Sequence, residues 1–168
     1  MKNKFYLIAI LIIIPVILGL AVLKQPSNPP ETPPGDTTTD FNLIFKYGIS
    51  GKNELNTFNQ TYTKDMIMDT PITVEFKLSE SELTDIYQKI NDFGIFNDKE
   101  LIEENVAVTP CSSYYLKVQI NSEQKELSWD NCRGRVNDEL QQFTDYIIQV
   151  IESKDEYKEL PDAKGGYL

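Results

Sequence analysis

The residue types that most often carry out chemistry in proteins are scarce in this chain. It has no histidine, and histidine is the commonest general acid or base and the commonest metal ligand. Ser-His-Asp triads and Cys-His dyads therefore lack a required residue. Ser122-Glu123-Gln124-Lys125 matches the S-x-x-K motif of serine acyl enzymes. That chemistry needs a buried lysine on a helix that presents the serine, whereas this segment is a polar turn. We predict a protein that is not an enzyme and holds no cofactor.

Four carboxylates lie in the segment after the first predicted helix, at Asp98, Glu100, Glu103 and Glu104. Carboxylates bind Ca²⁺ when a loop folds their oxygens around one ion, but the D-x-[DN]-x-[DN]-G spacing of such loops is missing. Spacings of three and four residues would instead place Glu100, Glu103 and Glu104 along one side of a short exposed helix. A cation site remains an alternative to the acidic helix. We predict the helix, and therefore no metal site.

The two cysteines, Cys111 and Cys132, flank a predicted β-hairpin. Their residue numbers sum to 243, and antiparallel partners across a turn near residues 121 and 122 sum to the same value. A four-residue turn would shift the pairing by two and still leave the cysteines close. Directly opposed strand residues meet the roughly 4.4–6.8 Å between Cα atoms that a disulfide requires. We predict a disulfide, which an extracytoplasmic compartment would preserve. A redox-active cysteine is the alternative, although it lacks a C-x-x-C spacing and a histidine partner.

The predicted binding site consists of four residues. Arg133 and Arg135 are the only arginines, and they follow Trp129 in a loop tethered by the predicted disulfide. Two guanidinium groups near a tryptophan suit a carboxylate, a phosphate or a partner protein. Alternatively, the arginines pair with the domain's own carboxylates and pin the loop to the second helix. Tyr115 projects to the opposite side of its strand from Tyr114, so we expect it to be exposed on the sheet.

A glycosylation sequon is present at Asn59-Gln60-Thr61. In an archaeal or eukaryotic secretory setting it would place Asn59 on the surface, and in most bacteria it would carry no meaning.

The charge of the chain argues against one class of partner. The first 24 residues contain three lysines and no acidic residue, so 13 basic side chains face 26 acidic ones in the remainder. A net charge of that size repels nucleic acid and anionic lipid. We therefore expect no nucleic-acid binding.

The N-terminal residues 1–24 are predicted to be a membrane anchor. Residues 5–23 form an uncharged apolar run, long enough at about 1.5 Å per residue to span nearly 30 Å of hydrocarbon. Lys2 and Lys4 precede it, which predicts a cytoplasmic N-terminus and an extracytoplasmic C-terminal domain. A cleaved signal peptide ending near Gly19-Leu20-Ala21 is the alternative and would make the protein secreted.

Residues 25–39 are predicted to be a linker. Five prolines and three consecutive threonines occur there, and proline removes the backbone donor that helices and sheets require. The segment is expected to be an extended polyproline stalk.

Residue alternation and capping signals predict the elements of the folded domain. Strands are expected at residues 41–47, 55–62, 72–78, 114–120 and 127–129. Ser79 and Glu82 form an S-x-x-E capping box at the start of a helix that ends near Gly94. Asn137 caps a second helix. Pro161 ends the last helical turn.

These elements predict an α+β domain over residues 40–161, followed by a flexible tail at residues 162–168. The element order β-β-β-α-β-β-α favours a small antiparallel sheet of about five strands with two helices on one face.

The expected function follows from this organisation. We predict a membrane-tethered, extracytoplasmic, non-enzymatic module that binds an envelope protein or another ligand of unknown identity. The alternative is a tethered or secreted inhibitor that acts on an envelope enzyme through the disulfide hairpin loop. An enzyme is the third possibility.

Overall fold

The structure is a computed structural model that describes residues 40–97, 102–104, 109–132 and 134–167. The predicted anchor and linker, with the apolar run at residues 5–23, lie outside these ranges. Within them, no helix combines the length and the apolar character needed to cross a membrane.

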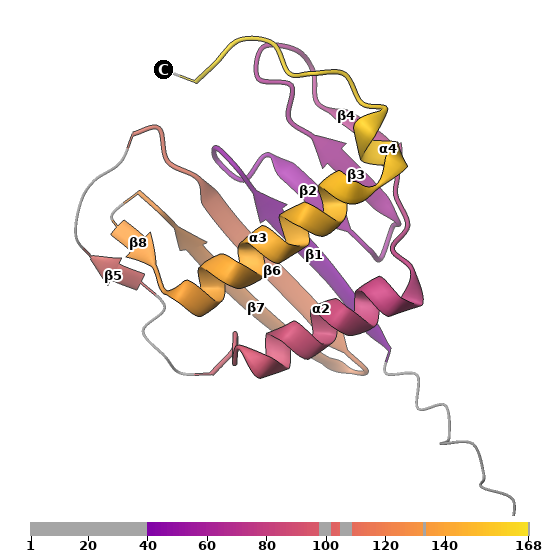
Figure 1. The fold of residues 1–168 in the computed structure, drawn as a ribbon, viewed down its shortest axis with the longest axis vertical. Coiled ribbons are helices and arrows are strands. Elements are labelled where there is room, and N and C mark those ends of the chain that lie inside the picture. Colours follow the sequence, from indigo (N-terminus) through magenta and orange to yellow (C-terminus); the bar gives the residue numbers. More distant parts are fainter. Residues whose placement is uncertain (1–39, 98–101, 105–108, 133, 168) are drawn as a thin grey trace, which may run out of the picture. The chain divides into compact units, whose positions relative to one another are not determined.

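Six antiparallel strands form the main sheet. They are β1 (Phe41–Tyr47), β2 (Asn53–Asn56), β3 (Thr61–Lys64), β4 (Ile72–Glu75), β6 (Ser113–Ile120) and β7 (Glu123–Asp130). Their order across the sheet is β4-β3-β2-β1-β6-β7. Two helices, α2 (Glu80–Asp92) and α3 (Asp138–Ser153), lie across the same face of this sheet, and a short helix, α4 (Asp155–Lys158), follows α3 (Figure 1). The predicted α+β class is confirmed.

Strict alternation of apolar side chains explains why β1 occupies the middle of the sheet. Phe41, Leu43, Phe45 and Tyr47 are all buried, while the residues between them are only half-buried. Odd and even positions of a strand point to opposite faces. The four buried side chains of β1 therefore face the helices. They belong to one core cluster that also includes Leu116 and Val118 of β6 and, from the helices, Ile86, Leu140, Phe143 and Ile147.

The prediction of a single strand over residues 55–62 is wrong, and the sheet has six strands because that segment folds back on itself. Residues 57–60 form a turn between β2 and β3. The Asn59 N–H donates to the Asn56 side chain at 3.2 Å, and Gln60 has a φ of 53°. Asparagine side chains compete in this way with strand pairing. In residues 55–62 this hydrogen bond to the Asn56 side chain outweighs the high content of Thr, Phe and Tyr, which favours a continuous strand.

A second, two-stranded ribbon was not predicted. β5 (Ile102–Glu104) pairs antiparallel with β8 (Gly134–Val136), and Glu103 lies opposite Arg135. The expected short acidic helix is therefore wrong at Glu103 and Glu104, which lie in a strand. Asp98 and Glu100 fall outside the described residues.

The capping signals of α2 are confirmed. The Ser79 hydroxyl accepts the Glu82 N–H at 3.2 Å, and the Glu82 carboxylate accepts the Ser79 N–H at 2.7 Å. Gly94 has a φ of 61°, in the left-handed region that follows many helix C-termini. Glu82 also accepts a hydrogen bond from Lys154 at 3.2 Å, which ties the start of α2 to the end of α3.

Ser79→Ala is expected to lower the free energy of unfolding by about 1 kcal/mol, because the first turn of α2 then loses its side-chain acceptor. Urea denaturation followed by circular dichroism measures the change. Ser81→Ala is the matched control. The Ser81 hydroxyl lies 3.1 Å from that of Ser79 but is not the acceptor of the Glu82 N–H, so its loss should cost less than half as much. Equal losses in both variants would contradict the capping role.

Candidate functional site

The β6–β7 hairpin positions two of the predicted binding residues, Tyr115 on β6 and Trp129 on β7. Its Cα partners run from Ser113 opposite Asp130 to Ile120 opposite Glu123. Each of these pairs sums to 243, so the predicted register is confirmed. The turn is Asn121-Ser122, and Asn121 has a φ of 54°, a conformation that asparagine tolerates in two-residue hairpin turns.

A disulfide between Cys111 and Cys132 closes the open end of this hairpin. The two Cα atoms are 4.9 Å apart. Between the disulfide and the first strand pair, the Ser112 N–H donates to the Asn131 side chain at 2.7 Å, and the Asn131 N–H donates to the Ser112 carbonyl at 3.1 Å. The predicted cysteine pair is therefore present, and β6 and β7 are joined at both ends.

Trp129, one of the predicted binding residues, is part of the core. Its side chain is only 4% exposed. Its ring stacks on that of Tyr114 at 5.3 Å between centroids, and Phe45 lies 6.4 Å away. The indole N–H is buried and has no hydrogen-bond partner among the described residues. Trp129 thus stabilises the hairpin against β1.

Tyr115 lies on the other face of the sheet from Trp129, as the alternation predicted. It is half-buried there, beside Lys46 of β1. Burial, and then a hydrogen bond to the Glu126 carboxylate, raise the pKa of Tyr115. Glu126 also pairs with Lys117 at 3.5 Å. The structure therefore does not bring Tyr115 and Trp129 together.

The described side chains do not include those of the two arginines. Arg133 lies outside the described residues. Arg135 is placed by its backbone, which pairs with Glu103 in the β5–β8 ribbon.

The face of the sheet without helices is the surface on which Tyr115 lies. Ion pairs and polar pairs connect neighbouring strands across it: Lys46–Glu54 at 3.0 Å, Lys117–Glu126 at 3.5 Å, Gln119–Gln124 at 3.1 Å and Thr63–Thr73 at 2.9 Å. Ile44 lies between Asn56 and Lys117 in the same face and is half-buried. The charges on this face are thus largely matched in pairs, around one apolar and one aromatic side chain.

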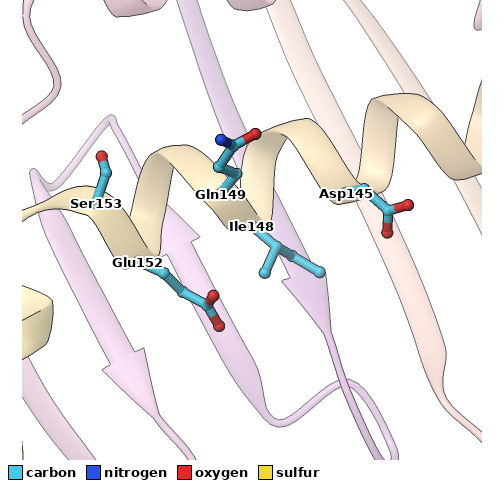
Figure 2. A pocket seen from close by; sticks show the side chains of 5 residues that line it. All are labelled: Asp145, Ile148, Gln149, Glu152 and Ser153. Carbon is cyan, nitrogen blue, oxygen red and sulfur yellow. The ribbon is translucent and has the colours of Figure 1, made fainter.

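A shallow hollow of about 370 Å³ lies on α3. Among the described residues, α3 alone lines it, through Asp145, Ile148, Gln149, Glu152 and Ser153 (Figure 2). Both carboxylates already have partners, since Asp145 accepts the Gln141 amide at 2.8 Å and Glu152 accepts the Tyr157 hydroxyl at 3.5 Å. In the described part of the chain, no group of three or more carboxylates or cysteines is placed to hold a metal ion.

Asn59 is exposed at the tip of the β2–β3 turn, next to Phe58, whose side chain is 40% exposed. The sequon is thus on the surface, and its modification remains a prediction.

The sequence analysis missed a pair of buried tyrosines. The hydroxyls of Tyr47 and Tyr62 lie 2.7 Å apart, and Asn53 lies 3.5 Å from Tyr62. Burial raises the pKa of Tyr47, and burial together with the neighbouring Tyr47 raises that of Tyr62. Their positions in two different predicted strands gave no signal that the hydroxyls would meet.

This pair predicts a loss of stability in alkali. A tyrosine pKa is about 10 in an unfolded chain, so above that pH the unfolded chain loses protons that folded Tyr47 and Tyr62 keep. The two tyrosines therefore contribute fully to the free energy of unfolding below about pH 10, and this contribution is lost as the pH rises further. We expect the free energy of unfolding to fall between pH 10 and pH 12, measured by urea denaturation at each pH. Tyr47→Phe should make this fall shallower, and an unchanged slope would contradict the assignment.

Comparisons with known proteins give no relative from which to transfer a function. Neither the protein-family models nor the curated protein sequences include a match to this chain.

Proposed function

We propose that the chain is a membrane-tethered, extracytoplasmic module that binds a partner protein and is not an enzyme. The apolar run at residues 5–23 would hold it in the membrane, and residues 25–39 would form the stalk. The proposed partner is an envelope protein.

The single observation that carries the proposal is the Cys111–Cys132 disulfide. Disulfides persist in oxidising compartments, and cytosolic reductants keep most thiols reduced. A disulfide that closes a surface hairpin therefore favours a domain outside the cytoplasm. The helix-free face of the sheet, with Ile44 and Tyr115 among paired charges, supports a binding role.

The location can be tested on intact cells with thiol labelling. Cells that express the full chain are treated with a membrane-impermeant reductant and then with an impermeant maleimide. We expect both cysteines to be labelled without lysis, and only after reduction. Labelling that requires lysis, or that occurs without reduction, would contradict an extracytoplasmic disulfide.

Binding can be tested by chemical crosslinking on the same intact cells. The full chain should yield a discrete crosslinked partner that an unrelated protein with the same anchor does not yield. The alternative is an inhibitor that acts on an envelope enzyme through the disulfide hairpin loop. It would bind a hydrolase one to one, and reduction of the Cys111–Cys132 bond would abolish that binding.

A further inference from the structure

Residues 161–167 follow α4 and cross one end of the sheet, beside the turn at residues 65–69 between β3 and β4 (Figure 1). Each of these seven residues is exposed or half-buried. Leu160, directly before them, still packs against the hydrophobic core. Beyond Leu160 the chain is therefore held on the domain mainly by polar contacts.

One set of contacts attaches this segment to β3 and to the tip of the turn. The Lys64 ammonium group donates to the Pro161 carbonyl at 3.0 Å. Lys164 forms a parallel bridge with Ile67, and its ammonium group pairs with Asp69 at 3.4 Å. The side chains of this ion pair are 79% and 53% exposed, so water and salt screen it.

A second set of contacts reaches the loop between β1 and β2. The Tyr167 hydroxyl donates to one carboxylate oxygen of Asp65. Lys52 donates to the same hydroxyl at 2.9 Å, and its ammonium group lies 4.8 Å from the centroid of the Tyr167 ring. The Asp65 N–H in turn donates to the Asn53 side chain at 2.9 Å. Residues 161–167 therefore tie together two loops that are distant from them in the sequence.

The turn that this segment holds is strained. Ile67 has a φ of 61°, which is an outlier for a β-branched residue. The Ile67 N–H donates to the other carboxylate oxygen of Asp65 at 3.1 Å. Such a conformation persists only while the surroundings over-determine it. Those surroundings include the bridge to Lys164 and the hydroxyl of Tyr167, and both belong to residues 161–167.

Gly165 allows the segment to approach the turn closely. It has a φ of 88°, and a Cβ at this position would lie 2.6 Å from the Met68 sulfur. Gly166 is different, because a Cβ there would meet nothing within 4 Å. The two neighbouring glycines therefore offer a matched pair of substitutions.

We propose that residues 161–167 are a releasable strap, which closes over the turn at residues 65–69 and opens while the rest of the domain stays folded. Segments with few buried apolar contacts and exposed hydrogen bonds open at a lower free energy than global unfolding requires. When the strap opens, Ile67 loses contacts that hold it in its strained conformation. The turn then relaxes, so it has two states and the strap selects between them. This device operates whether or not the chain binds a partner protein.

Hydrogen exchange of the full-length chain in detergent, followed by mass spectrometry, tests the strap. Peptides that cover residues 65–69 report on the turn, and peptides from the buried part of α3 report on global unfolding. In the wild-type chain, the turn should exchange at least about tenfold faster than α3.

Gly165→Ala should accelerate exchange of the turn by about fivefold or more, because a left-handed conformation is costly for alanine and the added Cβ meets Met68. Gly166→Ala is the matched control and should change exchange of the turn less than about twofold. Exchange of α3 should stay at the wild-type rate in both variants.

Tyr167→Phe provides a second variant, which removes a hydrogen bond to a carboxylate and keeps the ring. It should also accelerate exchange of the turn by about fivefold or more. Tyr115→Phe is its control, because the Tyr115 hydroxyl bonds to the Glu126 carboxylate elsewhere on the sheet. That variant should leave exchange of the turn unchanged.

Faster exchange that is confined to residues 65–69 and 161–167 in Gly165→Ala and Tyr167→Phe would support the strap. A wild-type turn that exchanges as slowly as α3 would overturn it, because only global unfolding would then release the segment. Equal exchange in Gly165→Ala and Gly166→Ala would also overturn it. So would an acceleration of α3 as large as that of the turn, which would indicate a loss of global stability.

Discussion

Trp129→Ala is expected to lower the free energy of unfolding by about 3–5 kcal/mol, the range for removal of a large buried aromatic side chain. The indole stacks on Tyr114 and lies near Phe45, so its loss leaves a cavity between the hairpin and β1. Urea denaturation followed by circular dichroism measures the change.

Trp129→Phe is the matched control, because it keeps an aromatic ring and removes an indole N–H that has no partner among the described residues. Its cost should stay below about 2 kcal/mol, since the aromatic packing is largely kept. If Trp129→Ala were folded as stably as wild type and lost only binding, the residue would belong to a surface site, as the sequence had predicted.

Replacing both Cys111 and Cys132 by serine is expected to cost about 3 kcal/mol, from the loop-closure entropy of a crosslink between residues 21 positions apart. The disulfide limits the freedom of the unfolded chain, and it also holds the Ser112 and Asn131 pairing in place. Fluorescence of Trp129, the only tryptophan, follows urea unfolding.

Reduction provides the control for this second prediction. A thiol reductant should destabilise the wild-type chain by a similar amount and leave the double-serine variant unchanged. A reductant that lowered the stability of both chains equally would show that the loss does not come from the disulfide.

Strong local signals explain why part of the fold could be predicted from the sequence. The capping box at Ser79, the cap at Asn137 and the alternation in β1 each depend on neighbouring residues alone. The hairpin register also has a local origin, because a two-residue turn fixes every pair that follows it. Each of these predictions is confirmed.

The remaining features depend on contacts that the sequence does not display. The β5–β8 ribbon joins segments some 30 residues apart through strands of three residues each, too short to show a period. Trp129 and Tyr115 were both candidate binding residues, and the packing of the helices on one face of the sheet decides that Trp129 belongs to the core. The turn at residues 65–69 gave no signal, because its shape depends on a hydrogen bond from the Asp65 N–H to Asn53 and on a bridge between Ile67 and Lys164.

The position of β1 would have a mechanical consequence if the domain is tethered as proposed. Asp40 directly precedes β1, so tension from the N-terminal side enters the fold at a strand flanked by β2 on one side and β6 on the other. A pull along β1 loads both hydrogen-bond ladders in shear, with many bonds sharing the force, whereas an edge strand such as β4 would peel away one bond at a time.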